Sequence, residues 1–92
     1  MDKKSVLKKL QTIPGIGKSM SLDLWNIGIR NVSDLSGKSP NKIYTKLNKF
    51  SGVTQDICVL YTFRCAVYYA TERRHEREKL NWWYWKDKTY ID

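Results

Sequence analysis

The segment from Ile57 to Ala70 constrains the fold more than any other part of the chain, because it is apolar on almost every side. Its apolar members are Ile57, Val59, Leu60, Phe63, Ala66, Val67 and Ala70. A helix that is apolar nearly all round is usually the central, buried helix of a small domain. We expect one long helix from Gln55 to Lys79, capped by Thr54, whose charged second half projects past the core.

The rest of the chain predicts shorter helices packed around this one. Apolar residues recur at steps of three and four, which is the spacing of one helix face. A first helix is expected over residues 5–12, a second after Pro14-Gly15 and ending near Gly28, and a short helical turn over residues 32–35. Ser39 followed by Pro40 is a strong start signal for another helix, which should end around residues 50–52. No segment alternates as a strand does, so the sequence predicts an all-α fold of about five helices.

The charge of the chain favours a polyanionic partner. Its 92 residues suffice for one domain, and 17 Lys and Arg against 9 Asp and Glu give a net charge of +8. No apolar run approaches the roughly 20 residues of a membrane span, and no signal peptide follows Met1. We therefore expect a cytoplasmic protein that does not contact membranes.

Cys58 and Cys65 are the two cysteines, seven residues apart in the long predicted helix. Seven helical residues rise about 10.5 Å, which is too far for a disulfide. Both are expected to be free thiols, as in a reducing cytoplasm. With His75 as the single histidine, we expect no zinc site, and the sequence predicts no metal or other cofactor.

The chain contains an internal repeat with a shift of 37 residues. The shift places Ile-Pro-Gly-Ile-Gly, residues 13–17, on Phe-Ser-Gly-Val-Thr, residues 50–54. The preceding helices superpose as well, since Val6 falls on Ile43 and Leu10 on Leu47. We therefore expect two units of helix, tight apolar hairpin and helix, related by a pseudo-twofold axis. Chance similarity between two amphipathic helix pairs is the alternative.

The first hairpin, from Ile13 to Ser19, has the features of an anion site. Gly15 and Gly17 allow positive φ and leave a bare backbone surface. The turn leads into a helix N-terminus, whose first amides point outward without an intrahelical partner and attract anions. Lys18 adds a positive charge there, and Ser19 adds a hydroxyl donor. Such a hairpin could hold a backbone phosphate of a nucleic acid, whereas a tight loop without a ligand is the plainer alternative.

The segment from Ile13 to Gly17, with the small Ser21 in the helix that follows, resembles the helix-hairpin-helix motif, a DNA-binding element that does not read sequence. The repeat resembles the tandem form of this motif. The wider pattern, through residues 52–61 and 63–70 to the aromatic residues 82–87, resembles a small bacterial family. That family is named after a pathogenicity-locus protein and the N-terminus of a mitomycin-resistance protein.

The resemblance implies that phosphate is held by the amides of Gly15, Ile16 and Gly17 together with Lys18 and Ser19. The second hairpin departs from the motif, because Thr54 stands in place of the second glycine and Asp56 stands where the first hairpin has Ser19. A carboxylate in the first helical turn caps the helix but repels phosphate. We therefore expect the second hairpin to be structural.

A set of lysines could add to DNA binding. Lys42, Lys46 and Lys49 fall at steps of four and three, which puts them on one face of the predicted third long helix. The face is either a stripe that follows DNA phosphates or an ordinary solvated surface.

The aromatic tail contains Trp82, Trp83 and Trp85, with Lys86 and Lys88 beside them. These tryptophans could stack on nucleic-acid bases, dock a protein partner, or fold back to close a small core. We favour folding back for two of the three.

Together these patterns predict a tandem helix-hairpin-helix domain over residues 1–80 with an aromatic tail, residues 81–92, packed on it. The favoured function is weak DNA binding without sequence preference, and the alternative is a protein-interaction module that uses the Trp-rich tail. We expect no enzymatic activity. Asp23 and Asp34 are isolated carboxylates, and a chain of this size has no room for a base-flipping pocket.

Overall fold

The computed structural model describes residues 2–88, which form four α-helices and three short 3-10 turns and contain no strand. The α-helices are α1 (Lys3–Leu10), α2 (Lys18–Asn26), α3 (Pro40–Ser51) and α4 (Ile57–Thr71). The 3-10 turns are η1 (Val32–Leu35), η2 (Arg77–Leu80) and η3 (Trp82–Asp87). The all-α prediction is confirmed, with four α-helices rather than about five, because residues 32–35 form a 3-10 turn.

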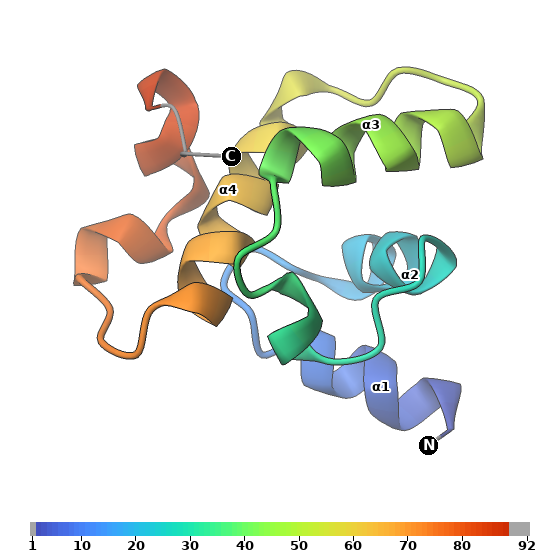
Figure 1. The fold of residues 1–92 in the computed structure, drawn as a ribbon, viewed down its shortest axis with the longest axis horizontal. Coiled ribbons are helices and arrows are strands. Elements are labelled where there is room, and N and C mark those ends of the chain that lie inside the picture. The colour runs from blue at the N-terminus through green and yellow to red at the C-terminus, as the bar shows by residue number, and fades with distance from the viewer. Residues whose placement is uncertain (1, 89–92) are drawn as a thin grey trace.

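α4 is the central helix, as its apolar sequence predicts. It lies between α3 and η1 on one side and the η2–η3 segment on the other (Figure 1). Phe63, Ala66 and Val67 are fully buried in the main core, which α1, α2, α3 and η1 complete. A second, smaller cluster on α4 joins Cys65 and Tyr68 to Trp85 of η3. Both faces of α4 are therefore covered.

α4 ends at Thr71, and the prediction that it continues to Lys79 is wrong. Glu72 is extended, and the chain folds back along the helix that it has just left. His75 stacks on Tyr69 with 4.8 Å between ring centres, and the amide of Glu76 donates to the Tyr68 hydroxyl over 2.8 Å. The reversal brings the aromatic residues of η3 against α4. Eight more helical residues would have carried them about 12 Å past its end.

The cap of α4 also differs from the prediction. Asp56, rather than Thr54, is the N-cap residue, and its carboxylate accepts a hydrogen bond from the amide of Cys58 over 2.8 Å. A carboxylate suits this place because the first helical amides lack intrahelical partners and carry partial positive charge.

Other helix boundaries follow from their caps. α1 begins earlier than predicted, because the carboxylate of Asp2 accepts from the amide of Ser5 over 2.8 Å, and it ends at Leu10 rather than at residue 12. α3 begins as predicted, with Ser39 as N-cap and Pro40 at the first position. It ends at Ser51, and the C-cap residue Gly52 has a φ of +76°, in the left-handed region that favours glycine.

Candidate nucleic-acid interface

The first hairpin, from Ile13 to Ser19, is held on the core by two isoleucines. Ile13 and Ile16 are both buried, on either side of Pro14 and Gly15. The amide of Ile16 donates to the carbonyl of Ile13 over 3.1 Å, which closes the turn. This amide is therefore engaged within the hairpin, although the sequence resemblance assigns it to phosphate. Gly15 has a φ of +84°, which few side chains tolerate.

The tip of the hairpin rests on α4 and η3. A Cβ built on Gly15 would lie 3.1 Å from Cγ2 of Thr62 and 3.9 Å from Cδ1 of Trp82. Gly17, by contrast, has nothing within 4 Å of the equivalent position. The hairpin is thus fixed on its Gly15 side and open on its Gly17 side, where α2 begins.

The N-terminus of α2 has no side-chain cap. Gly17 is its N-cap residue, and Lys18 and Ser19 are exposed in the first turn. The other three α-helices of the described chain are each capped by a side chain, from Asp2, Ser39 and Asp56. The first amides of a helix have no intrahelical acceptor, and the helix dipole makes this end attractive to anions. Within residues 2–88, no carboxylate or hydroxyl competes for these amides of α2 as a cap.

A shallow basic hollow adjoins this helix terminus. It has a volume of about 350 Å³ and is lined by Lys4, Leu7, Lys8, Gln11 and Lys18. Gln11 donates through Nε2 to Oγ of the buried Ser21 over 3.2 Å, and Ser21 Oγ donates to the carbonyl of Lys18 over 2.9 Å. These bonds fix α1 against the first turn of α2. The small residue at position 21 therefore allows the close approach that brings the lysines of both helices around one hollow.

The second hairpin, residues 50–56, differs from the first in the cap of its following helix and in the exposure of its apolar side chains. Asp56 occupies the N-terminus of α4 with its own carboxylate, and the hydrogen bond from the amide of Cys58 lowers the pKa of this carboxyl. Phe50 and Val53, which correspond to the buried Ile13 and Ile16, are each 61% exposed. This end of α4 is therefore negative and is flanked by exposed apolar side chains.

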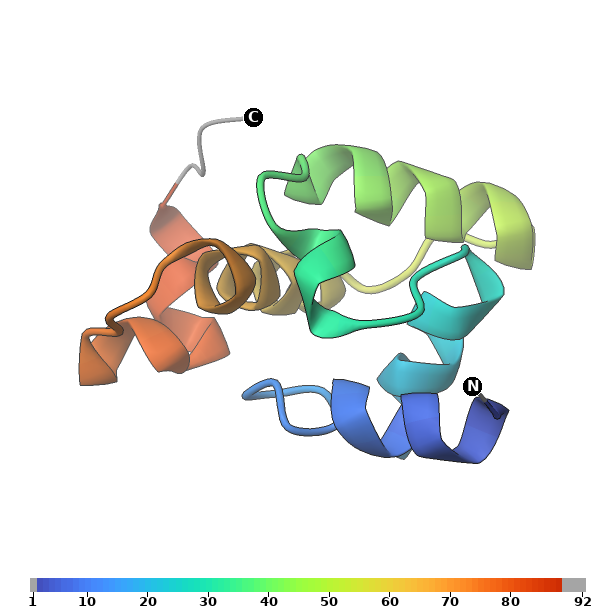
Figure 2. The same cartoon turned by 60° about the horizontal axis from the view of Figure 1, so that its bottom comes forward.

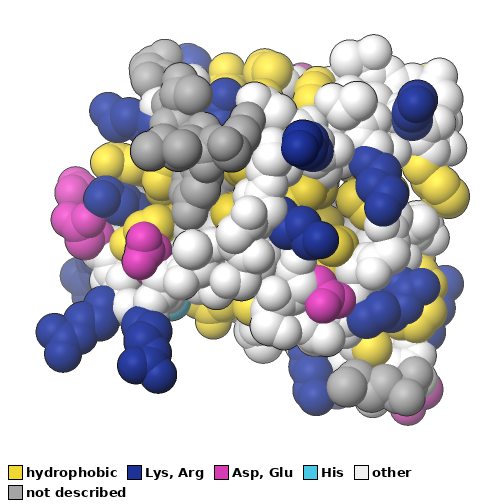
Figure 3. Space-filling model, in the orientation of Figure 1, with side chains coloured by type: hydrophobic (Ala, Val, Ile, Leu, Met, Phe, Trp, Pro, Cys, Tyr) yellow, Lys and Arg dark blue, Asp and Glu magenta, His cyan; other side chains and the backbone are white. Residues whose placement is uncertain are grey.

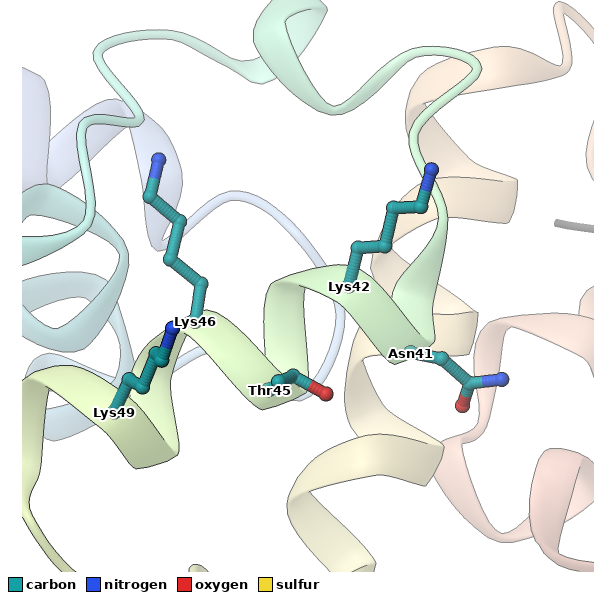
Figure 4. A pocket seen from close by; sticks show the side chains of 5 residues that line it. All are labelled: Asn41, Lys42, Thr45, Lys46 and Lys49. Atoms are coloured by element: carbon teal, nitrogen blue, oxygen red, sulfur yellow. The ribbon is translucent and has the colours of Figure 1, made fainter.

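The three lysines of α3 lie on one exposed face, as their spacing predicts. Lys42 and Lys46 point the same way from successive turns, and Lys49 continues the row (Figure 4). Lysine and arginine side chains are spread over the face that α3 forms, with hydrophobic patches between them (Figure 3). Lys38 joins Lys42 and Lys46 around a second hollow, of about 240 Å³.

The α3 lysines and the first hairpin do not form one continuous site. In Figure 2 the hairpin and α3 lie on opposite sides of α4, and they are also apart in Figure 1. The lysines that the structure brings to the hairpin are instead those of the hollow between α1 and α2, Lys4, Lys8 and Lys18.

The three tail tryptophans have three different environments. Trp85 is buried, and its Nε1 donates to the carbonyl of Lys79 over 2.9 Å. Trp82 is half-buried and lies beside Gly15 of the hairpin. Trp83 is 59% exposed. Of the tail tryptophans, Trp83 therefore presents the largest surface to a ligand.

The sequence matches the family described as Cdd1, pathogenicity locus, over residues 3–90. The chain belongs to this family. The match confirms the pathogenicity-locus part of the predicted resemblance, while its helix-hairpin-helix and mitomycin-resistance parts stay predictions. No curated protein and no solved structure matches the chain.

In this Cdd1-family chain, sequence reasoning did not assign Lys4 and Lys8 to the candidate site. Their spacing of four residues places them on one face of α1, but it does not show that α2 begins beside that face. Among the described residues, no group of three or more His, Cys, Asp or Glu side chains could hold a metal ion. No helix within residues 2–88 is long and apolar enough to cross a membrane.

Proposed function

We propose that the chain is a tandem helix-hairpin-helix domain. Two helix pairs, α1–α2 and α3–α4, are each joined by a short connection that contains a glycine with positive φ. These glycines, Gly15 and Gly52, are 37 residues apart, which is the shift of the sequence repeat. The apolar pairs of the repeat, Val6 with Ile43 and Leu10 with Leu47, are all buried.

We propose that this domain binds DNA through backbone phosphate, weakly and without sequence preference. The observation that carries the proposal is the N-terminus of α2, which has no side-chain cap and opens beside the basic hollow of Lys4, Lys8 and Lys18. The amides of Gly17, Lys18 and Ser19 are the donors for phosphate, together with the Lys18 and Ser19 side chains. The lysines of α3 add long-range attraction. Binding is weak because Asp56 fills the corresponding end of α4.

Salt-dependent binding tests this function. Fluorescence anisotropy of a labelled duplex, measured between about 50 and 150 mM salt, should give a log–log slope of about −2 to −4, as for two to four neutralised phosphates. Lys18→Glu should abolish binding at about 150 mM salt. Arg74→Glu makes the same change in net charge on the exposed segment after α4 and should weaken binding much less. Equal losses in the two variants would mean that diffuse charge, not the hairpin, attracts the DNA.

We also propose that the chain acts by binding and not by catalysis, in the cytoplasm. Asp34 has a structural role, since its carboxylate accepts from the amides of Arg30 and Asn31 at 2.9 and 3.2 Å, and Asp23 lies half-buried on α2. Both cysteines are free thiols, which fits a reducing compartment.

A protein-interaction module is the second candidate, and one observation favours it. Phe50, Val53 and Ile57 are exposed together around the second hairpin, at 61%, 61% and 48%. Solvent-exposed apolar groups that are close in the fold can mark an interaction surface. Sedimentation velocity over a range of concentrations would test self-association, which Phe50→Ser should abolish if this surface pairs two copies.

A further inference from the structure

Trp83 is a large apolar side chain that the fold leaves in solvent. Its neighbours Trp82 and Trp85 both pack, on the hairpin and on α4 respectively, whereas 59% of Trp83 is exposed. Folding therefore gains little from this indole. An aromatic face in this position is available to a ligand.

A lysine shares the face of Trp83. Residues i and i+3 of a 3-10 helix eclipse each other, so Trp83 and Lys86 project from the same side of η3. Lys86 is exposed as well. An aromatic ring with a cation beside it is the combination that single-stranded nucleic acids bind, the ring for the base and the cation for the phosphate.

This face adjoins the first hairpin. The ring of Trp83 meets that of Trp82 edge to face, with 5.7 Å between ring centres. Trp82 in turn lies beside the tip of the hairpin, with Cδ1 3.9 Å and Cβ 4.0 Å from the position of a Cβ on Gly15. A strand whose phosphate is held at the hairpin can therefore bring a neighbouring base to Trp83.

We propose that Trp83 stacks on an unpaired base of a single DNA strand whose backbone is held at the first hairpin. This inference rests on the proposed phosphate site, and it names the class of ligand, DNA with a single-stranded segment. A duplex hides the faces of its bases within the stack and offers Trp83 nothing to stack on except at an end. The chain should therefore prefer single strands to duplexes of equal charge.

Three labelled DNA probes of equal length test this inference by anisotropy: an oligothymidylate, an abasic single strand and a duplex. The oligothymidylate and the abasic strand carry the same phosphates, so stacking alone separates them. We expect the oligothymidylate to bind about five- to 150-fold more tightly than the abasic strand, which corresponds to one stacked base. Trp83→Ala should remove this difference and leave binding to the abasic strand and the duplex within about twofold of wild type.

Two further variants test whether the preference for thymidylate depends on an aromatic ring at position 83. Trp83→Phe retains an aromatic face and should preserve part of the preference for thymidylate. Phe50→Ala removes an aromatic side chain of similar exposure from the second hairpin and should change none of the three affinities. The urea midpoint of each variant shows whether it folds as the wild type does.

The outcomes separate this inference from the function on which it rests. Equal affinity of the wild type for thymidylate and abasic strands, with salt-sensitive binding to both, would overturn stacking and leave the phosphate site intact. An equal loss on all three probes in Trp83→Ala would also overturn stacking. If the wild type binds none of the probes at low salt, the phosphate site and the stacking face both fail.

Discussion

Gly15 packs against Thr62, so that a Cβ at the glycine would lie 3.1 Å from Cγ2 of the threonine. This contact joins the first hairpin to the central helix α4. It fixes the direction in which the hairpin presents the first turn of α2. It also means that Gly15 and Gly17 differ in how well their positions tolerate a side chain.

Gly15→Ala should destabilise the fold, and Gly17→Ala should not. Alanine at position 15 would have to adopt a φ of +84° and would crowd Thr62, which costs about 1–3 kcal/mol. Gly17 has a φ of −97° and open space around it. Its replacement should change the free energy of unfolding by less than about 0.5 kcal/mol, because the lower entropy of the unfolded chain offsets a poorer N-cap. Urea unfolding followed by tryptophan fluorescence measures both, and equal stability of the two variants would contradict this packing.

Trp85→Ala should be severely destabilising, whereas Trp83→Ala should be nearly neutral. Trp85 is buried against Cys65 and Tyr68, and Arg64 Nη1 donates to its carbonyl over 3.0 Å. Truncation of a buried tryptophan costs about 3–5 kcal/mol, while an exposed one costs about 0.5 kcal/mol or less. Thermal unfolding of the two variants tests whether η3 is part of the core. Similar unfolding midpoints of the two variants would show that η3 does not contribute to the core.

The two cysteines should differ in reactivity. Cys65 is buried, which raises the pKa of its thiol to about 11, and it should resist alkylation until the protein unfolds. Cys58 is exposed, but hydrogen bonding to Asp56 raises the pKa of its thiol. Asp56→Asn should lower that pKa and speed alkylation of Cys58 by iodoacetamide at pH 8, because only the thiolate reacts. Mass spectrometry should find one adduct on the native chain and two in denaturant, and rapid double labelling of the native chain would contradict the burial of Cys65.

Asp56 should also make the unfolding free energy depend on pH in the acidic range. The amide of Cys58 lowers the pKa of the Asp56 carboxyl in the folded chain below the ordinary value of about 3.9. The ionised carboxylate therefore stabilises the fold above the unfolded-state pKa, and this contribution is lost as the pH falls through the lower, folded-state pKa. The difference in unfolding free energy between wild type and Asp56→Asn should shrink between about pH 5 and pH 2. A difference that stays constant over this range would show that the carboxylate does not act as a charged cap.

Several parts of the fold that depend on neighbouring residues could be predicted from the sequence, although the caps of α1 and α4 were not among them. Ser39 and Pro40 define the start of α3, and Gly52 defines its end, because caps act within a few residues. The central place of α4 also follows from its composition. The sequence also places phosphate donors at the first hairpin, since turn and helix terminus are consecutive in the chain, but it does not show that the amide of Ile16 is bonded to the carbonyl of Ile13.

The parts that depend on distant residues could not be predicted in this way. The end of α4 at Thr71 is accompanied by contacts from residues further along the chain, since His75 stacks on Tyr69 and Trp85 packs on Tyr68. The charged sequence after Thr71 is by itself equally compatible with a projecting helix. The same holds for the site. Nothing near Gly15 indicates that Trp82 lies beside it, and nothing near Lys18 indicates that Lys4 and Lys8 share its hollow.

The most direct test of the account is an amide-resolved NMR titration of the ¹⁵N-labelled chain with a short DNA. We predict that the largest shifts fall on the amides of Gly17, Lys18 and Ser19, with smaller shifts on α1 around Lys4 and Lys8. Residues 52–56 of the second hairpin should stay nearly unchanged. Shifts centred on the second hairpin or on the lysines of α3, with the start of α2 unaffected, would contradict the claim that the first hairpin holds the phosphate.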